Sequence, residues 1–189
     1  MQLLRRAGYA FHTTAEFQIV RDIKEKHCSV ESFKSKKDMD IYSKKEENHQ
    51  VKPWDYKLPD GNILKLGNER FKAAEILFKP ELIGLEYPGI HEMVVSCIQK
   101  CDIDLRKTLY SNIIVAGSTT LMSNFCERLH KQVQQLVPQD VKPVLIAPNN
   151  RQYSCWIGGG IVSSLKAFNK MWVSKKDFEE DGRFFSLSI

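Results

Sequence analysis

A short apolar segment, NIIVA at positions 112–116, constrains the fold of this chain more than any other feature. It is rich in β-branched residues and ends at Gly117, which is typical of a strand buried on both faces at the centre of a sheet. A polar Gly-Ser-Thr-Thr loop follows, and apolar residues then recur at helical spacing from Phe125 to Leu136. A second apolar run, VLIA at 144–147, repeats the strand pattern. This order of strand, polar loop and helix predicts an α/β fold.

The other elements are predicted from local signals. Thr13 and Glu16 form a Thr-x-x-Glu capping box, which predicts a helix over about 14–28. Pro-Asp-Gly-Asn at 59–62 separates the segments WDYKL and NILKL and predicts a β-hairpin. The Lys-, Glu- and Ser-rich stretch 31–50 is typical of a mobile, solvated loop. Further helices are expected at the N-terminus up to Gly8, over 69–77, up to about residue 100, from Ile161 onwards and over about 175–180.

The composition excludes several classes of protein. The chain has 189 residues, 42% of them apolar and 27% charged, which suffices for one domain or two small lobes with a core. The net charge of +5 is spread among acidic residues, so no nucleic-acid partner is expected. Five cysteines without a CxxC pair indicate neither a disulfide framework nor a zinc site, and favour a reducing compartment. No signal peptide and no run of 18 apolar residues is present, so we expect no membrane partner and a cytosolic or nuclear location.

The loop Gly117-Ser118-Thr119-Thr120 is a candidate anion site. It lies between a predicted strand and a predicted helix, where backbone N–H groups and hydroxyls can bind a phosphate. The same pattern is common in α/β proteins that bind nothing there. The chain contains neither GxxxxGK[ST] nor GxGxxG, so the two commonest nucleotide motifs are absent from the sequence.

Two further groups of residues each allow two interpretations. Arg21, Lys24 and Glu25 lie on neighbouring positions of one predicted helix, where they can contact a ribose and a base or simply pair on a solvated surface, and local spacing favours surface pairing. The apolar row from Ile161 to Met171 is expected to be core, with a groove for a partner helix as the alternative. The histidines show no metal-ligand spacing and no nucleophilic triad is apparent, so no metal ligand and no catalytic residue is predicted.

Five longer segments contain most of these residues. They are GYAFHTTAEFQIVRDIKEK (8–26), LPDGNILKLGNERF (58–71), GIHE (89–92), AGSTTLM (116–122) and YSCWIGGGIVSSLKAFNKMWVSKKDFEEDG (153–182). Through these segments, nearly the whole chain resembles the C-terminal half of actin and the actin-related proteins. Within that family, FHTTAEF and MWVSKKDFEEDG are more similar to centractin, the filament-forming actin-related protein of dynactin, than to conventional actin.

The resemblance implies half of the actin-like ATPase fold, truncated at the N-terminus. Residues 1–80 would form the outer lobe of this half, 81–153 an inner α/β lobe, and 154–189 a helical segment that returns to the absent N-terminal lobe. It also implies ATP or ADP as cofactor, with Mg²⁺ or Ca²⁺ held by the missing half. By correspondence, the nucleotide-binding residues would be Arg21, Lys24, Glu25, Gly117, Ser118, Thr119, Met122 and Gln152.

The same resemblance implies a cytoplasmic, cytoskeletal structural protein that is a subunit or truncated form of an actin-related filament such as that of dynactin. Its partners would be actin-like protomers and actin-binding or dynactin-type proteins. An assembly-coupled ATPase with the N-terminal half supplied elsewhere, and a nuclear subunit of a chromatin complex, remain alternatives. By correspondence with the family's apolar plug and groove, the partner-binding residues would be Ile83, Leu85, Ile157, Ile161, Val162, Leu165 and Met171.

Some positions depart from the family pattern. Ser118 replaces a glycine, Met122 an aromatic residue and Gln152 a lysine, so an altered nucleotide affinity is expected. The phosphate loops, the cation-binding carboxylates and the residues that position the attacking water belong to the N-terminal half of the family. Because phosphoryl transfer depends on such positioning, this chain by itself is not expected to hydrolyse ATP. A fragment, a truncated isoform and a shortened paralogue are the three interpretations.

Overall fold

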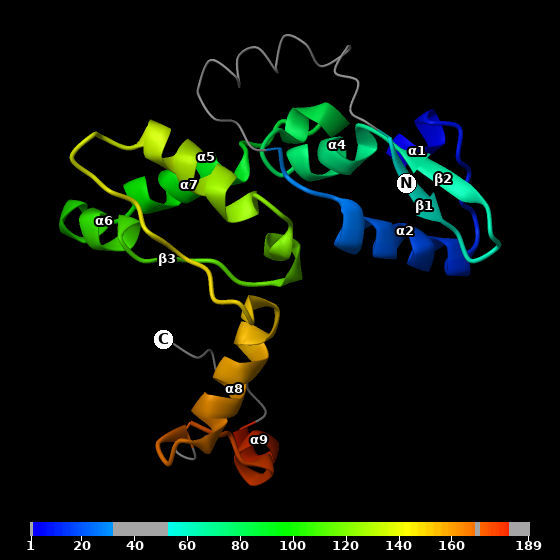
Figure 1. Ribbon diagram of the computed structural model, residues 1–189. Coiled ribbons are helices and arrows are strands. Elements are labelled where there is room, and N and C mark those ends of the chain that lie inside the picture. The colour runs from blue at the N-terminus through cyan, green and yellow to red at the C-terminus, as the bar shows by residue number, and fades with distance from the viewer. Residues whose placement is uncertain (1, 32–52, 169–170, 182–189) are drawn as a thin grey trace.

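The computed structural model describes residues 2–31, 53–168 and 171–181. Figure 1 shows one group of elements around α1, α2 and a β-hairpin, a second group around α5, α6 and α7, and an arm made of α8 and α9. Helix α4 lies between the first two groups. Apart from its first residue, Glu31, the predicted polar loop at 31–50 lies outside the described residues, as does the C-terminal tail at 182–189.

The first group begins with two helices whose ends were predicted. Helix α1 spans Gln2–Arg6 and α2 spans Thr14–His27. Glu16 Oε2 accepts hydrogen bonds from the backbone N–H groups of Thr13 and His12, both at 2.7 Å, and Thr13 Oγ1 accepts from the Glu16 N–H at 3.3 Å. The predicted capping box and the helix that it starts are therefore confirmed.

The predicted β-hairpin is also confirmed. Strand β1 (Trp54–Lys57) pairs antiparallel with β2 (Ile63–Leu66). The two leucines of β2 are buried while its other two residues are exposed, so strand periodicity directs one face to the core. The turn is closed by Asp60, whose carboxylate accepts from the Asn62 N–H at 3.0 Å. The core of this group consists of Leu4, Phe11, Ile23, Leu64 and Leu66.

The second group is built mainly from helices. The predicted helices of this group are found as α5 (Ile90–Gln99) and α7 (Phe125–Leu136). The predicted helix α4 (Glu69–Glu75), which lies between the two groups, contributes Ala74 to the core of this group and is followed by a 3-10 turn, η1 (Pro80–Ile83). Their buried side chains form a second core together with residues from the flanking segments. Its members are Val30, Ala74, Phe78, Val95, Ile98, Tyr110, Val115, Phe125, Leu129, Val133 and Val137.

One helix of this group, α6 (Ile103–Tyr110), was not predicted. Its apolar residues do not form a single buried face, because Ile103 and Leu105 are exposed and only Tyr110 is buried. Helical periodicity identifies a helix only when the apolar positions share one side. The sequence signal was therefore too weak to find this element.

The predicted central strand is wrong in its extent and burial. Strand β3 contains only Ile113–Ile114 and pairs in parallel with β4 (Leu145–Ile146) in a two-stranded sheet. Ile113 packs against the second core, whereas Ile114 is 72% exposed. Successive side chains of a strand point to opposite faces, and here only one face is covered by the described residues. A run of apolar residues does not by itself supply the second covering layer.

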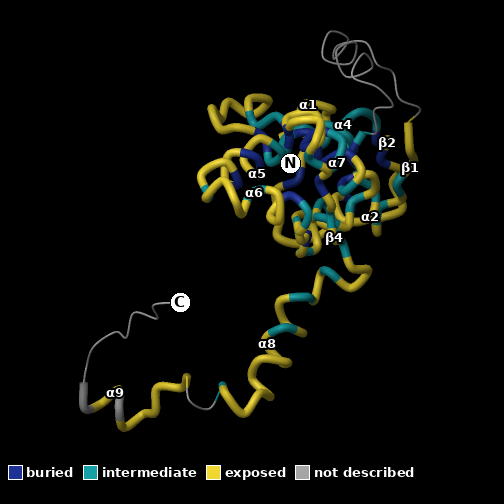
Figure 2. Tube along the Cα trace, turned by 90° about the vertical axis from the view of Figure 1, so that its left-hand side faces the viewer, coloured by how far each residue is buried: buried dark blue, intermediate teal, exposed yellow. Residues whose placement is uncertain are grey.

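The interpretation of the C-terminal apolar row as core is also wrong. Helix α8 (Ser154–Ser164) contains no buried residue, and Trp156 is 84% exposed. The glycines at 158–160 lie inside this helix instead of preceding it, and no neighbouring atom lies within 4 Å of a Cβ placed at any of them. Helix α9 (Lys175–Asp181) follows, and Figure 2 shows both helices extending away from the rest of the molecule.

Candidate functional site

The turn that follows β3 is the candidate anion site. Gly117 has φ 94° and ψ 154°, a conformation that residues with a side chain avoid. Residues Ser118–Leu121 then form a 3-10 turn, η2, and helix α7 begins only at Phe125. The predicted order of strand, polar loop and helix is therefore found, with the short turn η2 formed within the loop. Ser118 and Thr119 are exposed and Met122 is half-buried.

The backbone N–H of Gly117 is already used within the protein. It donates to the Arg151 carbonyl oxygen at 2.9 Å. The side available for a ligand is instead the space next to the Gly117 Cα, because no atom lies within 4 Å of a Cβ placed there. This open space fits the approach of an anionic group, and the next two residues, Ser118 and Thr119, are exposed and carry hydroxyl donors.

Gln152, another predicted nucleotide-binding residue, is held next to this turn. It belongs to a 3-10 turn, η3 (Arg151–Tyr153), and is itself exposed. The preceding residue, Arg151, donates from Nε to Thr120 Oγ1 and from Nη2 to the Thr120 carbonyl, both at 2.9 Å. The structure thus brings the Gly117 turn and Gln152 together.

The three predicted residues of α2 are all exposed on that helix. Arg21 Nε and Glu25 Oε1 form an ion pair at 2.9 Å, and the hydrogen bond with Glu25 raises the pKa of Arg21. The surface pairing favoured by the sequence is thus present in the structure for these two residues. Exposed pairs of this kind are weak, so the pair leaves both side chains available to a ligand.

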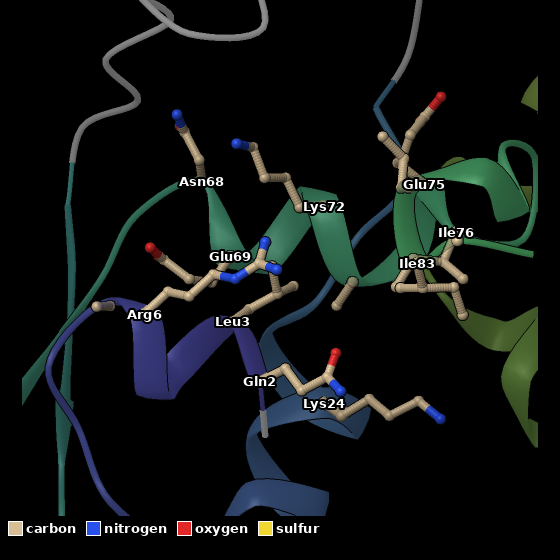
Figure 3. Close-up of a pocket in the computed structure, with 14 residues that line it drawn as sticks. Gln2, Leu3, Arg6, Lys24, Asn68, Glu69, Lys72, Glu75, Ile76 and Ile83 are labelled. Atoms are coloured by element: carbon tan, nitrogen blue, oxygen red, sulfur yellow. The ribbon is translucent and has the colours of Figure 1, made fainter.

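Lys24, the third of these residues, lines a cavity of about 990 Å³ between α1, α2, α4 and η1. Figure 3 shows the side chains that line it, including the positively charged Arg6, Lys24 and Lys72. Ile83, predicted to bind a partner, lies on its wall. The residues of the Gly117 turn and Gln152 do not line this cavity.

The chain segments after α2 and after η2 run side by side. Ser29 and Ser123 form a parallel bridge, in which the Val30 N–H donates to the Ser123 carbonyl at 3.0 Å. Asn124 Nδ2 donates to the Val30 carbonyl at 3.1 Å. These bonds connect the C-terminal end of the helix that carries Lys24 and Glu25 to the end of the Gly117 turn.

The predicted partner-binding residues are all exposed, but they lie on two separate elements. Ile83 and Leu85 lie in and just after η1. The remaining residues lie on α8 and in the segment that follows it. They are Ile157, Ile161, Val162, Leu165 and Met171.

Arg151 is the residue of this site that sequence reasoning missed. Its hydrogen-bond partner Thr120 is 31 positions away, so no local spacing reveals the contact. The only available signal was its position directly before Gln152.

The described residues form neither a metal site nor a membrane-spanning helix. Within residues 2–31, 53–168 and 171–181, no three or more His, Cys, Asp or Glu side chains are grouped so that they could hold a metal ion. In the same ranges, each helix is either too short or too polar to cross a lipid bilayer.

Comparison with known proteins gives a consistent result. A family model described as Actin matches residues 2–185. A protein described as "Actin-like protein" from Neurospora crassa is 48% identical over 179 residues, which are 95% of this chain and 47% of that protein. The chain therefore spans about half the length of this curated relative.

Proposed function

Because the chain belongs to the actin family, we propose that it is a structural component of an actin-like cytoskeletal assembly and holds ATP or ADP as a structural cofactor. The observation that carries this proposal is the extent of the family match, residues 2–185, which includes every residue assigned to the nucleotide and to partners. Within the family, we propose a centractin-type role in a filament such as that of dynactin, with a cytoplasmic location.

Three features of the chain support nucleotide binding. The space beside the Gly117 Cα is open, and the two hydroxyl-bearing residues that follow it, Ser118 and Thr119, are exposed. Lys24 contributes an exposed positive charge on α2, and the segment after that helix is bonded to the end of the Gly117 turn. The phosphates of a bound nucleotide would carry negative charge. Lys24 would orient the nucleotide by its charge, and the hydroxyls of Ser118 and Thr119 would orient it by hydrogen bonds.

Titration of the full 189-residue chain with a fluorescent ATP analogue, with and without Mg²⁺, tests this proposal. We expect binding without turnover, and about tenfold weaker binding for Lys24→Ala, because one charged contact is lost. Lys26→Ala is the matched control, since Lys26 is on the same helix and pairs with Asp22 at 3.3 Å. Absence of binding would contradict the cofactor assignment, and turnover would replace it by the ATPase alternative.

Exposed apolar side chains support binding to other protein chains. Ile83 and Leu85 are 47% and 43% exposed, and the apolar residues of α8 have no covering layer among the described residues. Exposed apolar groups of this size are typical of protein–protein interaction sites. We therefore assign actin-like protomers and actin-binding or dynactin-type proteins as partners.

Co-sedimentation with actin filaments and with dynactin filaments tests the partner assignment. We expect Ile83→Ser with Leu85→Ser to reduce the amount that pellets, because apolar contact area is lost. Ile103→Ser is the control, since Ile103 is 74% exposed but lies on α6, outside the proposed surfaces. If the control reduces pelleting as strongly as the double substitution, the assignment of η1 is wrong.

A further inference from the structure

We infer that Arg151 is a positioning residue for the nucleotide: it holds the turn at 117–122 and ties it to the segment that carries Gln152. The nucleotide in this inference rests on the proposed function. The role of Arg151 itself rests on hydrogen bonds of the described residues.

Arg151 is bonded to the Gly117 turn through both its backbone and its side chain. Its carbonyl accepts from the Gly117 N–H at 2.9 Å, at the residue where the turn begins. Its Nε and Nη2 donate to the hydroxyl and the carbonyl of Thr120, both at 2.9 Å. The backbone of Arg151 therefore fixes the first residue of the turn, Gly117, and its side chain fixes Thr120, near the end of the turn.

The Arg151 side chain also contacts the segment that follows β4. Arg151 Nη1 donates to the Pro148 carbonyl at 3.1 Å, so the guanidinium bridges the segment after β4 and the segment after β3. Thr120 Oγ1 in turn donates to the Gly117 carbonyl at 2.7 Å. These bonds form one connected network around Gly117, Thr120 and Arg151.

The geometry requires arginine in particular. Three different nitrogens of one planar guanidinium serve three acceptors, and a lysine ammonium on a flexible stem does not reproduce that fork. The network fixes the conformation of Gly117, next to the open space where an anionic group fits. Loss of the three guanidinium hydrogen bonds is therefore expected to make the turn more mobile and, as a result, to weaken nucleotide binding.

Hydrogen exchange of the full chain, followed by mass spectrometry, measures the first effect without any nucleotide. The N–H groups of Gly117, Thr120 and Met122 are all hydrogen-bonded in or to the turn, so a peptide over 113–124 reports on it. We expect exchange in this peptide to be about tenfold faster in Arg151→Lys and in Thr120→Val.

Arg106→Lys is the matched control. Arg106 is also half-buried, and its Nε donates to the Cys101 carbonyl at 2.9 Å, but it lies on α6. Exchange in the 113–124 peptide should not change in this variant. Unchanged exchange in both Arg151→Lys and Thr120→Val would overturn the inference.

Titration with the fluorescent ATP analogue measures the second effect. We expect the Kd of Arg151→Lys to rise about tenfold and that of Arg106→Lys to stay within about twofold, even if both variants lose similar thermal stability. The double variant Arg151→Lys with Thr120→Val should bind the analogue no more weakly than the weaker of the two single variants, because both substitutions remove the same hydrogen-bond network.

The possible failures are distinguishable. If the wild-type chain binds the analogue and Arg151→Lys binds it equally well, the inference is overturned and the proposed function stands. If the wild-type chain does not bind the analogue, the proposed cofactor is overturned, and with it any role of Arg151 toward a nucleotide.

Discussion

Arg128 of α7 is the charged residue most constrained by its surroundings among those described. Its side chain and that of Glu75 on α4 are 2% and 3% exposed, and Nη2 lies 2.8 Å from Glu75 Oε1. Nη1 donates to the Glu31 carbonyl at 3.0 Å, and the guanidinium carbon lies 5.0 Å from the centre of the Phe78 ring. Burial raises the pKa of Glu75, and the Arg128 charge opposes that rise. The side chain of Arg128 thus joins α7 to α4 by a buried ion pair and to the segment after α2 by a hydrogen bond.

Glu75→Gln is expected to lower the free energy of unfolding by about 3 kcal/mol, because it leaves the buried Arg128 charge without its counter-charge. Urea denaturation followed by circular dichroism measures this. Glu127→Gln is the control, since Glu127 pairs with Lys131 on the surface of the same helix at 2.6 Å and should cost at most about 1 kcal/mol. An equal loss of unfolding free energy in the two variants would contradict the claim that burial makes the Arg128–Glu75 pair the more important one.

Gly117 and Gly158 differ in backbone conformation but not in surrounding space. Neither has an atom within 4 Å of an added Cβ, and only Gly117 has a positive φ. We expect Gly117→Ala to lose about 1–3 kcal/mol through backbone strain, and Gly158→Ala, inside a helix, to be neutral or stabilising by up to about 1 kcal/mol. Urea unfolding of both variants compares them, and an unaffected Gly117→Ala would show that the strained conformation is not required.

At the scale of elements, helix α2 depends on the capping box at its N-terminus. The backbone N–H groups of Thr13 and then His12 lower the pKa of Glu16 by donating to its carboxylate. A carboxylate with a lowered pKa stabilises the folded state above the unfolded pKa, and this stabilisation is lost as the pH falls through the folded pKa. The contribution of the cap is therefore pH-dependent, with its full value at neutral pH.

Thr13→Ala should cost about 1 kcal/mol at pH 7, because one N-cap acceptor is removed. Glu16→Gln should also destabilise the chain at pH 7, and its difference from the wild type should shrink as the pH falls through the lowered pKa of Glu16, because the wild-type carboxylate is then protonated. Urea midpoints measured from pH 7 to pH 3 test both. If the stability difference between Glu16→Gln and the wild type does not depend on pH, the charge of the Glu16 carboxylate is not the origin of the capping effect.

At the scale of the whole molecule, the arm of α8 and α9 is separate from both cores. No residue of α8 is buried, and Figure 2 shows most of the described part of the arm as exposed and the remainder as intermediate. Its apolar side chains contribute little to the stability of the rest of the chain, because little of their surface is removed from water. They remain available for contact with another protein chain.

Trp156→Ser with Ile161→Ser should therefore change the free energy of unfolding by no more than about 0.5 kcal/mol for each exposed site. The same double variant should lose pelleting with filaments. Thermal unfolding and co-sedimentation measure the two effects, and a large loss of stability would mean that α8 packs on the chain. Phe125→Ala is the contrast, since Phe125 is 2% exposed in the second core and should cost about 3–5 kcal/mol.

The sequence by itself determined the capping box, the hairpin, most of the helices and the membership of the actin family. Each of these elements depends on contacts between residues a few positions apart, such as the bond of Asn62 to Asp60 two positions before it. For the same reason, local spacing identified Arg21 and Glu25 as a surface pair. The assignment of these residues and of the Gly117 turn to a nucleotide stays a prediction.

Only the tertiary structure decided that Ile114 is exposed, that α8 has no buried residue, that Arg128 pairs with Glu75 and that Arg151 is bonded to the Gly117 turn. The partners of these arginines lie 31, 53 and 97 positions away, and no periodicity in a single sequence links residues at such separations. Burial likewise depends on which layers cover an element. Ile113 and Ile114 are adjacent and identical in type, yet only Ile113 packs against the core, because strand geometry directs them to opposite faces.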